Sequence, residues 1–186
     1  MTGTLLHSEV MIDLETMGLG PTAAIIQIGA VHFNADKVLH TFSCNVMLQS
    51  SIAYGMTTDK DTQDWWRGRH DDASAFRGVA HPLPEALSSF TGWLAGLPDF
   101  HGGGVWSKGP AFDAAVLEHA CRLVGFERPW HHRQVRDQRT IERTALALGW
   151  SRPQYPEPDH DALSDAIGQV EQVQDAWRFI KSKAES

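Results

Sequence analysis

The stretch that decides the fold is EVMIDLE, residues 9–15, which reads as a short buried β-strand. Turn-forming glycine and proline residues follow, and AAIIQIGAVHF, residues 23–33, reads as a second strand rich in β-branched side chains. A tight turn at residues 34–36 leads into KVLHTFSCNV, residues 37–46, whose alternating pattern predicts a third strand. Because short loops join the three strands, they predict an antiparallel meander.

Beyond the meander, helices and strands alternate. Residues 50–81 are polar and are expected to form a long excursion that contains one short helix around DTQDWWRGRH. Apolar periodicity and turn signals predict helices at 82–97, 110–124, 140–148 and 161–181, and short strands at 103–108 and 134–137. The sequence therefore predicts an α/β fold with a mixed five-stranded sheet, in which parallel strands extend the meander and helices flank it.

The composition is that of one soluble globular domain. The chain has 186 residues, 42% of them hydrophobic and 21% charged, which predicts a single domain over residues 1–186. Asp and Glu number 23 against 16 Lys and Arg, and the net charge of −7 argues against tight coating of duplex nucleic acid. It leaves open an enzyme that binds a chain end locally, or one whose carboxylates hold metal ions.

Signals for secretion or membrane insertion are not evident. The beginning, MTGTLLHSEV, lacks a basic region followed by a long apolar stretch, so we expect no signal peptide. No apolar run reaches membrane-spanning length, so we expect no membrane association. The two cysteines, Cys44 and Cys121, lie far apart in apolar settings and are expected to be reduced thiols. We therefore expect a cytoplasmic protein.

The first strand carries two carboxylates on one face. Alternate side chains of a strand share a face, so Asp13 and Glu15 lie side by side, about 7 Å apart at Cα. Two like charges there repel each other, and desolvating them costs several kcal/mol unless a cation is present. A divalent cation would remove this cost. The alternative is a strand end that emerges into solvent with both carboxylates hydrated.

A third carboxylate, Asp113, lies in the first turn of the helix predicted at 110–124. The helix dipole favours an acid there, but that account would place it on the solvent side. Asp113 instead precedes Leu117 by four residues and falls on the apolar side of the helix. A charged partner or a metal explains that position better.

The last helix opens on DHDALSDAIGQV, residues 159–170, which contains three carboxylates and a histidine. Asp161 and Asp165 are four residues apart on one side of the helix, and Asp161 is interpreted as an acid favoured by the helix dipole. His160 and Asp165 are separated by about 140° on an ideal helix. They can serve one point only if His160 lies on the incoming loop.

These groups suit one kind of chemistry. Carboxylates with open positions suit Mg²⁺ or Mn²⁺, which prefer oxygen ligands and retain waters. Two such ions can clamp the attacking and leaving oxygens of a phosphoryl displacement. A neutral histidine can take a proton from the attacking water near neutral pH. The pattern therefore predicts hydrolysis of a phosphodiester.

Three segments of the chain resemble the motifs of the DEDDh 3′–5′ exonucleases. DLETMGLGPTAAIIQIGAVHF, residues 13–33, resembles their first motif, and VWSKGPAFDAAVL, residues 105–117, their second. HDALSD, residues 160–165, resembles the third motif, H-x-x-x-x-D, and the three occur in the family's order. DTQDWW and VRDQRT further resemble a subgroup of phage exodeoxyribonucleases and mycobacterial-type exoribonucleases.

The resemblance implies an RNase H-like fold and a metal-dependent exonuclease that acts on single-stranded 3′ ends of DNA or RNA and releases nucleoside monophosphates. It implies two Mg²⁺ or Mn²⁺ ions and assigns His160 as the general base. Relatives are often homodimers, so a homodimer is one expected state. The metal ligands implied by the same match are Asp13, Glu15, Asp113 and Asp165.

Further residues are expected to contact the substrate. Thr16 and Met17 match family positions that contact the terminal nucleotide. Trp65 and Trp66 lie close to arginines, and bases stack on such rings. Neighbours on a helix diverge, so one of the pair at most is expected to face the substrate. The predicted substrate contacts are Thr16, Met17, Trp66, Trp106 and Lys108, and Lys108 departs from the small or amide residue usual in the subgroup.

Two other functions fit the same fold. A nucleic-acid-end binding protein would be expected to lack a ligand or the base, whereas all five positions are filled here. A structure-selective endonuclease on an RNase H-like core is the second alternative. The histidine five residues before the last acid favours the exonuclease.

Overall fold

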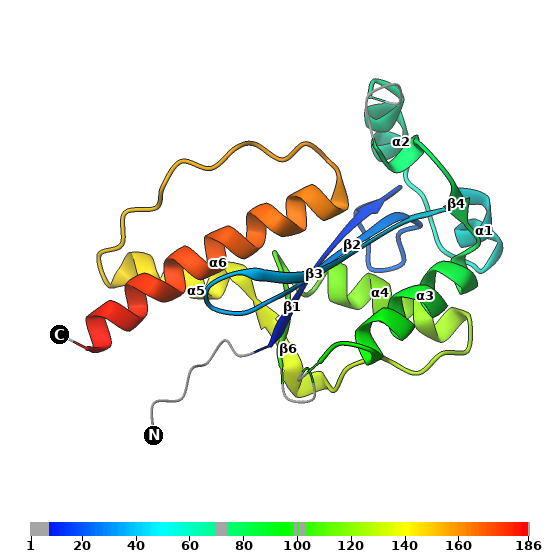
Figure 1. Ribbon diagram of the computed structural model, residues 1–186. Helices are drawn as coiled ribbons and strands as arrows, with labels where there is room; N and C mark the ends of the chain where they lie inside the picture. The colour runs from blue at the N-terminus through cyan, green and yellow to red at the C-terminus, as the bar shows by residue number, and fades with distance from the viewer. Residues whose placement is uncertain (1–7, 70–73, 99, 101–102, 186) are drawn as a thin grey trace.

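The structure, a computed structural model, describes residues 8–69, 74–98, 100 and 103–185. Its centre is a six-stranded mixed sheet in the order β4-β3-β2-β1-β5-β6 (Figure 1). The strands are β1 Glu9–Thr16, β2 Ile25–Phe33, β3 Val38–Val46, β4 Ala80–His81, β5 Val105–Ser107 and β6 Val135–Asp137.

The predicted meander is confirmed, because β1 pairs with β2, and β2 with β3, in antiparallel register. Strand β5 runs parallel to β1, and β6 runs parallel to β5, as expected of strands added by βα units. The sheet has six strands rather than the predicted five. The additional strand, β4, lies in the polar excursion and pairs two residues with the end of β3. A strand of two residues is too short to show an alternating pattern.

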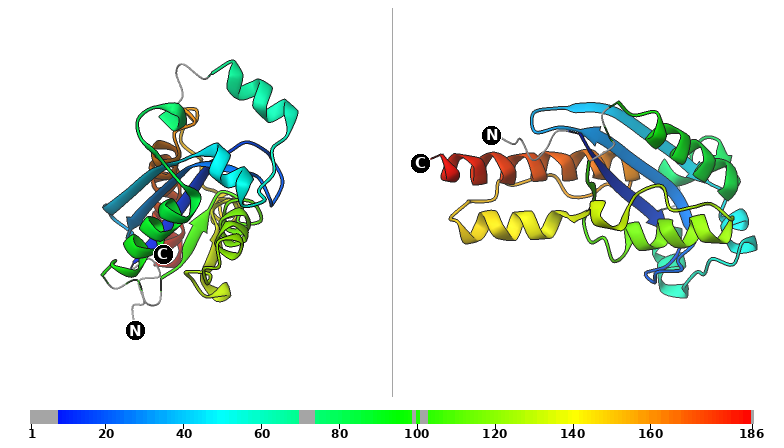
Figure 2. Two further views of the ribbon diagram at one scale, coloured as in Figure 1. Left: turned by 90° about the vertical axis from the view of Figure 1, so that its right-hand side faces the viewer. Right: turned by 90° about the horizontal axis from the view of Figure 1, so that it is seen from below.

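Helices cover both faces of the sheet (Figures 1 and 2). Helices α3 and α4 pack on one face, whereas α6 lies along the other face over β1 and β2, with α5 beside it. The helices are α1 Leu48–Ala53, α2 Lys60–Arg67, α3 Leu83–Ala95, α4 Asp113–Leu123, α5 Gln138–Ala147 and α6 Ala162–Ala184, with short 3₁₀ turns at Ser74–Phe76 and His132–Gln134.

Alternation along β1 divides the core into two clusters. Val10, Ile12 and Leu14 belong to the larger cluster, with α3 and α4. Met11 belongs to the smaller cluster, whose other members include Val170 and Val173 of α6. Because Asp13 and Glu15 continue the face of Met11, the smaller apolar cluster ends where the carboxylates begin.

The start of α6 is seated directly on β2. A Cβ atom at Gly29 would lie 2.2 Å from the backbone carbonyl of Ala162, so no residue with a side chain fits there without moving the helix. Gln27 fixes the same helix end: its Oε1 accepts from the Ala162 amide at 2.9 Å, and its Nε2 donates to Asp161 at 3.2 Å. Gly29 pairs with Asp13, and Gln27 with Glu15. The helix start is therefore held beside the carboxylates of β1.

Two smaller expectations can be compared with the fold. Cys44 and Cys121 are both free thiols, as predicted. In the described part of the chain, none of the helices combines the length and the apolar character that crossing a bilayer requires.

Candidate active site

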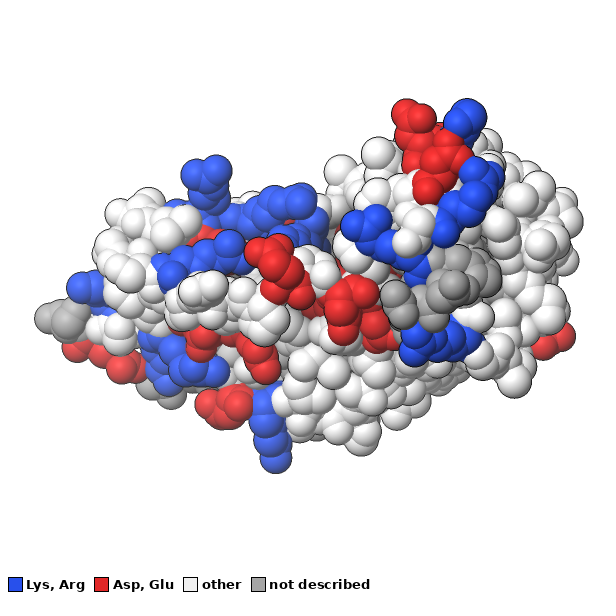
Figure 3. Space-filling model, turned by 90° about the horizontal axis from the view of Figure 1, so that it is seen from above, with Lys and Arg blue, Asp and Glu red and all other residues white. Residues whose placement is uncertain are grey.

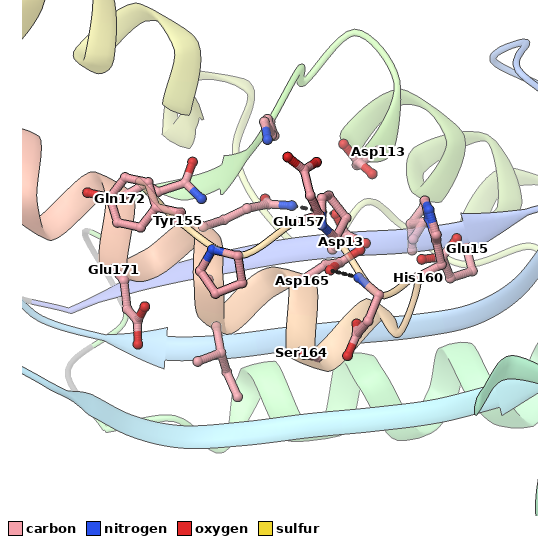
Figure 4. A pocket seen from close by; sticks show the side chains of 18 of the residues that line it. Asp13, Glu15, Asp113, Tyr155, Glu157, His160, Ser164, Asp165, Glu171 and Gln172 are labelled. Carbon is pink, nitrogen blue, oxygen red and sulfur yellow. Dashed lines mark hydrogen bonds between the residues drawn. The ribbon is translucent and has the colours of Figure 1, made fainter. Parts of the chain in front are cut away.

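A groove of about 500 Å³ lies between the end of β1, the beginning of α4, α6 and the segment that leads into α6 (Figure 4). This segment, residues 151–161, runs without regular structure from α5 back to the start of α6. The groove is lined by all five of the residues predicted to carry the chemistry: Asp13, Glu15, Asp113, His160 and Asp165.

Strand β1 presents Asp13 and Glu15 to this groove, as the alternation predicted. Glu15 is buried, with 8% of its surface exposed, and Asp13 is partly buried. Asp13 accepts a hydrogen bond of 2.6 Å from Gln169 Nε2 of α6. The strand end is therefore largely covered, which argues against the alternative of two fully hydrated carboxylates.

Asp113 lies in the first turn of α4 and is 6% exposed. Its position on the buried side of the helix is as predicted. The preceding residue, Phe112, also lines the groove. The loop between β5 and α4, which contains Gly109 at φ +119°, brings the helix start to the end of β1.

The opening of α6 supplies the last two groups. Asp165 lies in the first turn and accepts a hydrogen bond of 3.3 Å from the Asp159 amide. Asp161 is the N-cap and accepts from the Ser164 amide at 2.8 Å, which confirms its structural role. His160 lies on the incoming loop, as required, with a left-handed φ of +59°. Its ring nitrogen and the carboxylate oxygens of Glu15 and Asp165 lie within 4.8 Å of one another.

Crowding and burial shift the pKa values of the acids upward. Burial, with Asp165 and other acids nearby, raises the pKa of Glu15 to about 8. Burial also raises the pKa of Asp113 to about 6, although backbone hydrogen bonds and Arg139 lower it. The pKa of Asp13 is raised well above its usual value by burial, Asp113 and Glu15, and that of Asp165 is raised mainly by burial. Arg139 lowers the pKa of Asp113 and His160 lowers that of Asp165, but burial outweighs both, and the pKa values of all four acids are raised.

These residues fit a divalent cation. The donors are carboxylate oxygens from β1, α4 and α6, which are the ligands that hard cations prefer. A cation among them would favour the ionised form of carboxylates whose pKa values burial raises. Within the described residues, the group whose possible ligand atoms lie closest together is Glu15, His160 and Asp165, and Asp13 and Asp113 line the same groove.

A second hollow adjoins the site on the side of α2. It is lined mainly by apolar and aromatic groups, among them Thr16, Leu19, Trp65, Phe112 and His160. The Trp65 ring lies edge-on to the His160 ring, with centroids 4.6 Å apart, and the Arg69 guanidinium lies 4.0 Å from the Trp65 ring centre. Trp65 is half-buried, so part of its ring can meet a ligand.

Three of the predicted substrate contacts are buried in the fold. Trp66 is 3% exposed, and its Nε1 donates to the Thr16 carbonyl at 2.9 Å, so its indole is hydrogen-bonded to the end of β1. Trp65, in contrast, lies at the edge of the site. The Met17 side chain is buried in the larger core cluster. Trp106 is 7% exposed and donates to Glu9 at 2.7 Å within the α6-side core. Burial does not favour substrate contact by Met17 or Trp106, whereas Trp66 lines the same hollow as Trp65, and contact by any of the three stays a prediction.

Two predicted contacts keep positions consistent with that role. Thr16 lines the hollow beside Trp65, although its hydroxyl donates to the Gly18 carbonyl at 2.8 Å. Lys108 lines the groove next to Asp113 and is half-buried. Substrate contact by either residue stays a prediction.

Three residues that organise the site were not predicted from the sequence: Gln27, Gly29 and Gln169. Gln169 is 6% exposed, lines the groove and orients Asp13, and its own Oε1 has no hydrogen-bond partner among the described residues. One signal was available for it, because Gln169 follows Asp165 by four residues and so shares its helix face. A polar Gln27 and a glycine inside an otherwise apolar strand were the corresponding signals in β2.

Known proteins share this architecture. The nuclease domain of 3′hExo, a DEDDh family member whose structure was solved bound to rAMP, aligns with a TM-score of 0.62 at 14% identity over 95% of this chain and 94% of that one. Cell-death related nuclease 4 (CRN-4) aligns with a TM-score of 0.65 at 17% identity over 96% of this chain and 65% of that one. These similarities show that the fold is the RNase H-like fold of DEDDh nucleases, as predicted.

Sequence relatives point in the same direction. Over 132 residues the chain is 26% identical to an exodeoxyribonuclease of Enterobacteria phage T4, across 62% of this chain and 56% of the phage protein, so it matches little more than half of that relative. The model of the 3′–5′ exoribonuclease Rv2179c-like domain matches residues 8–177, most of the chain. On this evidence the chain belongs to the Rv2179c-like 3′–5′ exoribonuclease family.

Proposed function

We propose that this protein is a metal-dependent 3′–5′ exonuclease that hydrolyses phosphodiester bonds at single-stranded nucleic-acid ends and releases nucleoside monophosphates. The observation that carries the proposal is the convergence of four carboxylates, from three elements far apart in sequence, with a histidine on one groove. Membership of the exoribonuclease family supports the same reaction.

The proposed ligands are Asp13, Glu15, Asp113 and Asp165, and the proposed ions are two Mg²⁺ or Mn²⁺. Such ions, when bound, neutralise charge on the phosphoryl group and lower the pKa of the attacking water. Residues of the chain orient the carboxylates. Gln169 fixes Asp13 through a hydrogen bond, and the close packing of the α6 start on Gly29 holds Asp165 beside β1. The three elements thereby bring the acidic groups to one place before substrate arrives.

His160 is proposed as the general base. Its ring is held between the acidic cluster and the edge of Trp65, and it lies at the junction of the groove and the aromatic hollow. A neutral imidazole there can take a proton from water that attacks a phosphodiester bound in the groove. Its left-handed backbone directs the ring toward the site from the loop, which a residue inside the helix could not do.

The substrate is proposed to place its terminal nucleoside in the hollow beside Thr16, Trp65 and Phe112, because apolar and aromatic walls suit a base and sugar. The phage relative is an exodeoxyribonuclease and the family model describes an exoribonuclease, so both DNA and RNA are candidate substrates. We further propose a single catalytic domain spanning the chain, a cytoplasmic location, and a homodimer as a candidate assembly.

The test uses a 12-nucleotide single strand labelled at its 5′ end, in DNA and RNA forms, with Mg²⁺, Mn²⁺ or EDTA. We expect metal-dependent shortening by one nucleotide at a time, with mononucleotide products. The same strand with a 3′-phosphate and a circular strand serve as controls. Asp13→Ala is the matched inactive variant.

Other outcomes would identify the alternative functions. Cleavage inside a circular strand would refute the exonuclease and favour the structure-selective endonuclease. Tight binding of the 3′ end, with no metal-dependent cleavage of any strand, would favour the end-binding protein.

A further inference from the structure

The lining of the catalytic groove includes exposed carboxylates and one lysine. Glu157 and Asp159, both exposed, lie on the segment that leads into α6, and Glu171 lies farther along α6 (Figure 4). Lys108 lines the same groove and directly follows β5. Figure 3 shows acidic side chains at the centre of this face, with basic side chains on either side of them. A polyanionic strand is repelled by the carboxylates and attracted by the cations.

Arg139 of α5 lies close to the loop that contains Lys108. Gly109, next to Lys108, has a φ of +119°, and a Cβ atom there would lie 2.5 Å from Arg139 Nη1. The guanidinium therefore packs on the backbone of the loop that leads to Asp113, and its charge lowers the pKa of that carboxyl. Arg139 thus lies at the edge of the reaction site.

Arg143 extends the basic surface by one helical turn. Arg139 and Arg143 are four residues apart, both exposed, and line a shallow hollow on α5 with Thr140, Thr144 and the N-cap Asp137, whose carboxylate accepts from the Arg139 amide and the Thr140 hydroxyl. Like charges at this spacing destabilise a helix. On α2 and α6 the exposed cations are neutralised within the helix, as in the pairs Lys60–Asp64 and Arg178–Asp175.

The α5 pair and Lys108 differ from those cations. Within the described ranges, Lys108, Arg139 and Arg143 form no ion pair with a carboxylate, although the chain has 23 acids. Three cations that form no ion pair, one in the groove and two on the neighbouring helix α5, provide binding partners for an external polyanion.

From these features we propose that Lys108, Arg139 and Arg143 form a track that binds the phosphates of the single strand upstream of the bond to be cut. The proposal rests on the proposed exonuclease function and adds a path for the rest of the substrate. The terminal nucleoside lies beside Trp65, and the preceding phosphates lie along Lys108 and α5. The occupant is the phosphodiester backbone of single-stranded DNA or RNA. The exposed carboxylates of Glu157 and Asp159 repel the strand from their part of the groove.

Binding of a 5′-fluorescent 12-mer and a trimer, followed by anisotropy in Ca²⁺ over a salt titration, tests the track. We expect Arg143→Gln to weaken 12-mer binding about 2- to 5-fold, the usual worth of one exposed ion pair. The slope of log affinity against log salt should fall by about 0.7. Replacing all three cations by Gln should weaken 12-mer binding about 10- to 100-fold and trimer binding less.

Arg122→Gln is the matched control, because Arg122 is also exposed on a helix, α4, but that helix packs on the opposite face of the sheet. We expect the affinity of Arg122→Gln for the 12-mer to match wild type. We expect Glu157→Gln, which removes an acid from the groove lining, to bind the 12-mer equally or more tightly. Equal 12-mer affinity and salt slope for Arg143→Gln, the triple variant and Arg122→Gln would overturn the track.

The two proposals can fail separately. Wild-type protein that shortens the 12-mer in Mn²⁺ while the triple variant binds normally would remove the track and leave the exonuclease intact. Wild-type protein that binds the 12-mer through these cations but releases no mononucleotide would remove the exonuclease and leave the track.

Discussion

The two faces of the sheet are built from the same strands yet serve different purposes. Toward α3 and α4, β1 contributes Val10, Ile12 and Leu14 to a large, continuous apolar cluster. Toward α6 it contributes Met11 to a smaller cluster and then two carboxylates. Half of one strand therefore stabilises the fold by burying apolar surface, while the other half holds like charges together at a cost in stability.

The comparison shows how the molecule tolerates an electrostatically unfavourable site. The larger cluster supplies burial energy away from the charges, and α6 is fixed at its start by Gly29 and Gln27 rather than by apolar contacts alone. Separation of the two tasks predicts separable mutations: changes on the α6 face alter chemistry, and changes on the α3 face alter stability.

The largest effect is expected from Asp13→Asn, set against Leu87→Ala in α3. Asp13→Asn removes a proposed metal ligand and also a repelling charge, so we expect cleavage to fall to background while the melting temperature is equal or higher. Leu87 is fully buried, and its truncation should cost about 2–5 kcal/mol of unfolding free energy without lowering kcat of the folded fraction. Thermal melts and single-turnover assays measure both. Loss of activity in the folded Leu87→Ala protein would refute the separation.

The next effect concerns His160. His160→Asn removes the imidazole and keeps a residue that tolerates the left-handed backbone at φ +59°. We expect kcat to fall about 10²- to 10⁴-fold, the usual worth of a general base, with folding retained. His160→Ala tests whether the backbone adds a stability cost of its own. A general base contributes far more than threefold to the rate. If the asparagine variant kept a kcat within about threefold of wild type, His160 would be excluded as the base.

Gln169→Leu should weaken Mn²⁺ binding about 10- to 100-fold, as is usual when a group that orients a metal ligand is removed. The physical reason is the lost 2.6 Å hydrogen bond to Asp13. Gln174→Leu is the control, because Gln174 is buried on the same helix but donates to the Asn34 carbonyl instead. Calorimetric titration measures both variants, and equal Mn²⁺ affinity in the two would remove the positioning role of Gln169.

The smallest effect is a dependence of stability on pH in metal-free protein. The pKa of Glu15 is about 8 in the fold against a usual 4.5, so at intermediate pH the folded state holds a proton that the unfolded chain has lost. Stability should therefore fall as pH rises from about 5 to 8. We expect Glu15→Gln to flatten this decline in thermal melts made in EDTA. A wild-type melting temperature that rises over the same range would contradict the buried, uncompensated carboxylate.

The sequence was most informative where patterns are regular. The meander, the β5 and β6 strands and the helices from α3 onward were predicted with ends shifted by a few residues, because apolar periodicity reports burial directly. Strand β4 and helix α1 were not predicted, since two and six residues give too little periodicity within a polar segment.

The site was predictable to the extent that charge conflicts with burial. Asp13, Glu15 and Asp113 stood out because each occupies a face that should be apolar. The aromatic residues gave no such conflict: Trp66 and Trp106 are as compatible with a core as with a substrate, and the fold placed both in the core. The roles of Gly29 and Gln169 depend on a close approach of α6 to β1 and β2 that only the tertiary structure defines.

Calorimetric titration of Mn²⁺ into wild-type protein and Asp13→Asn at neutral pH tests most directly that the α6 face is a metal centre. We expect two ions per wild-type chain, with protons released on binding because the raised pKa of Glu15 keeps that carboxyl protonated in the metal-free protein, and loss of at least one ion in Asp13→Asn. Wild-type protein that binds no Mn²⁺, or an Asp13→Asn variant that binds both ions with unchanged affinity, would contradict the assignment.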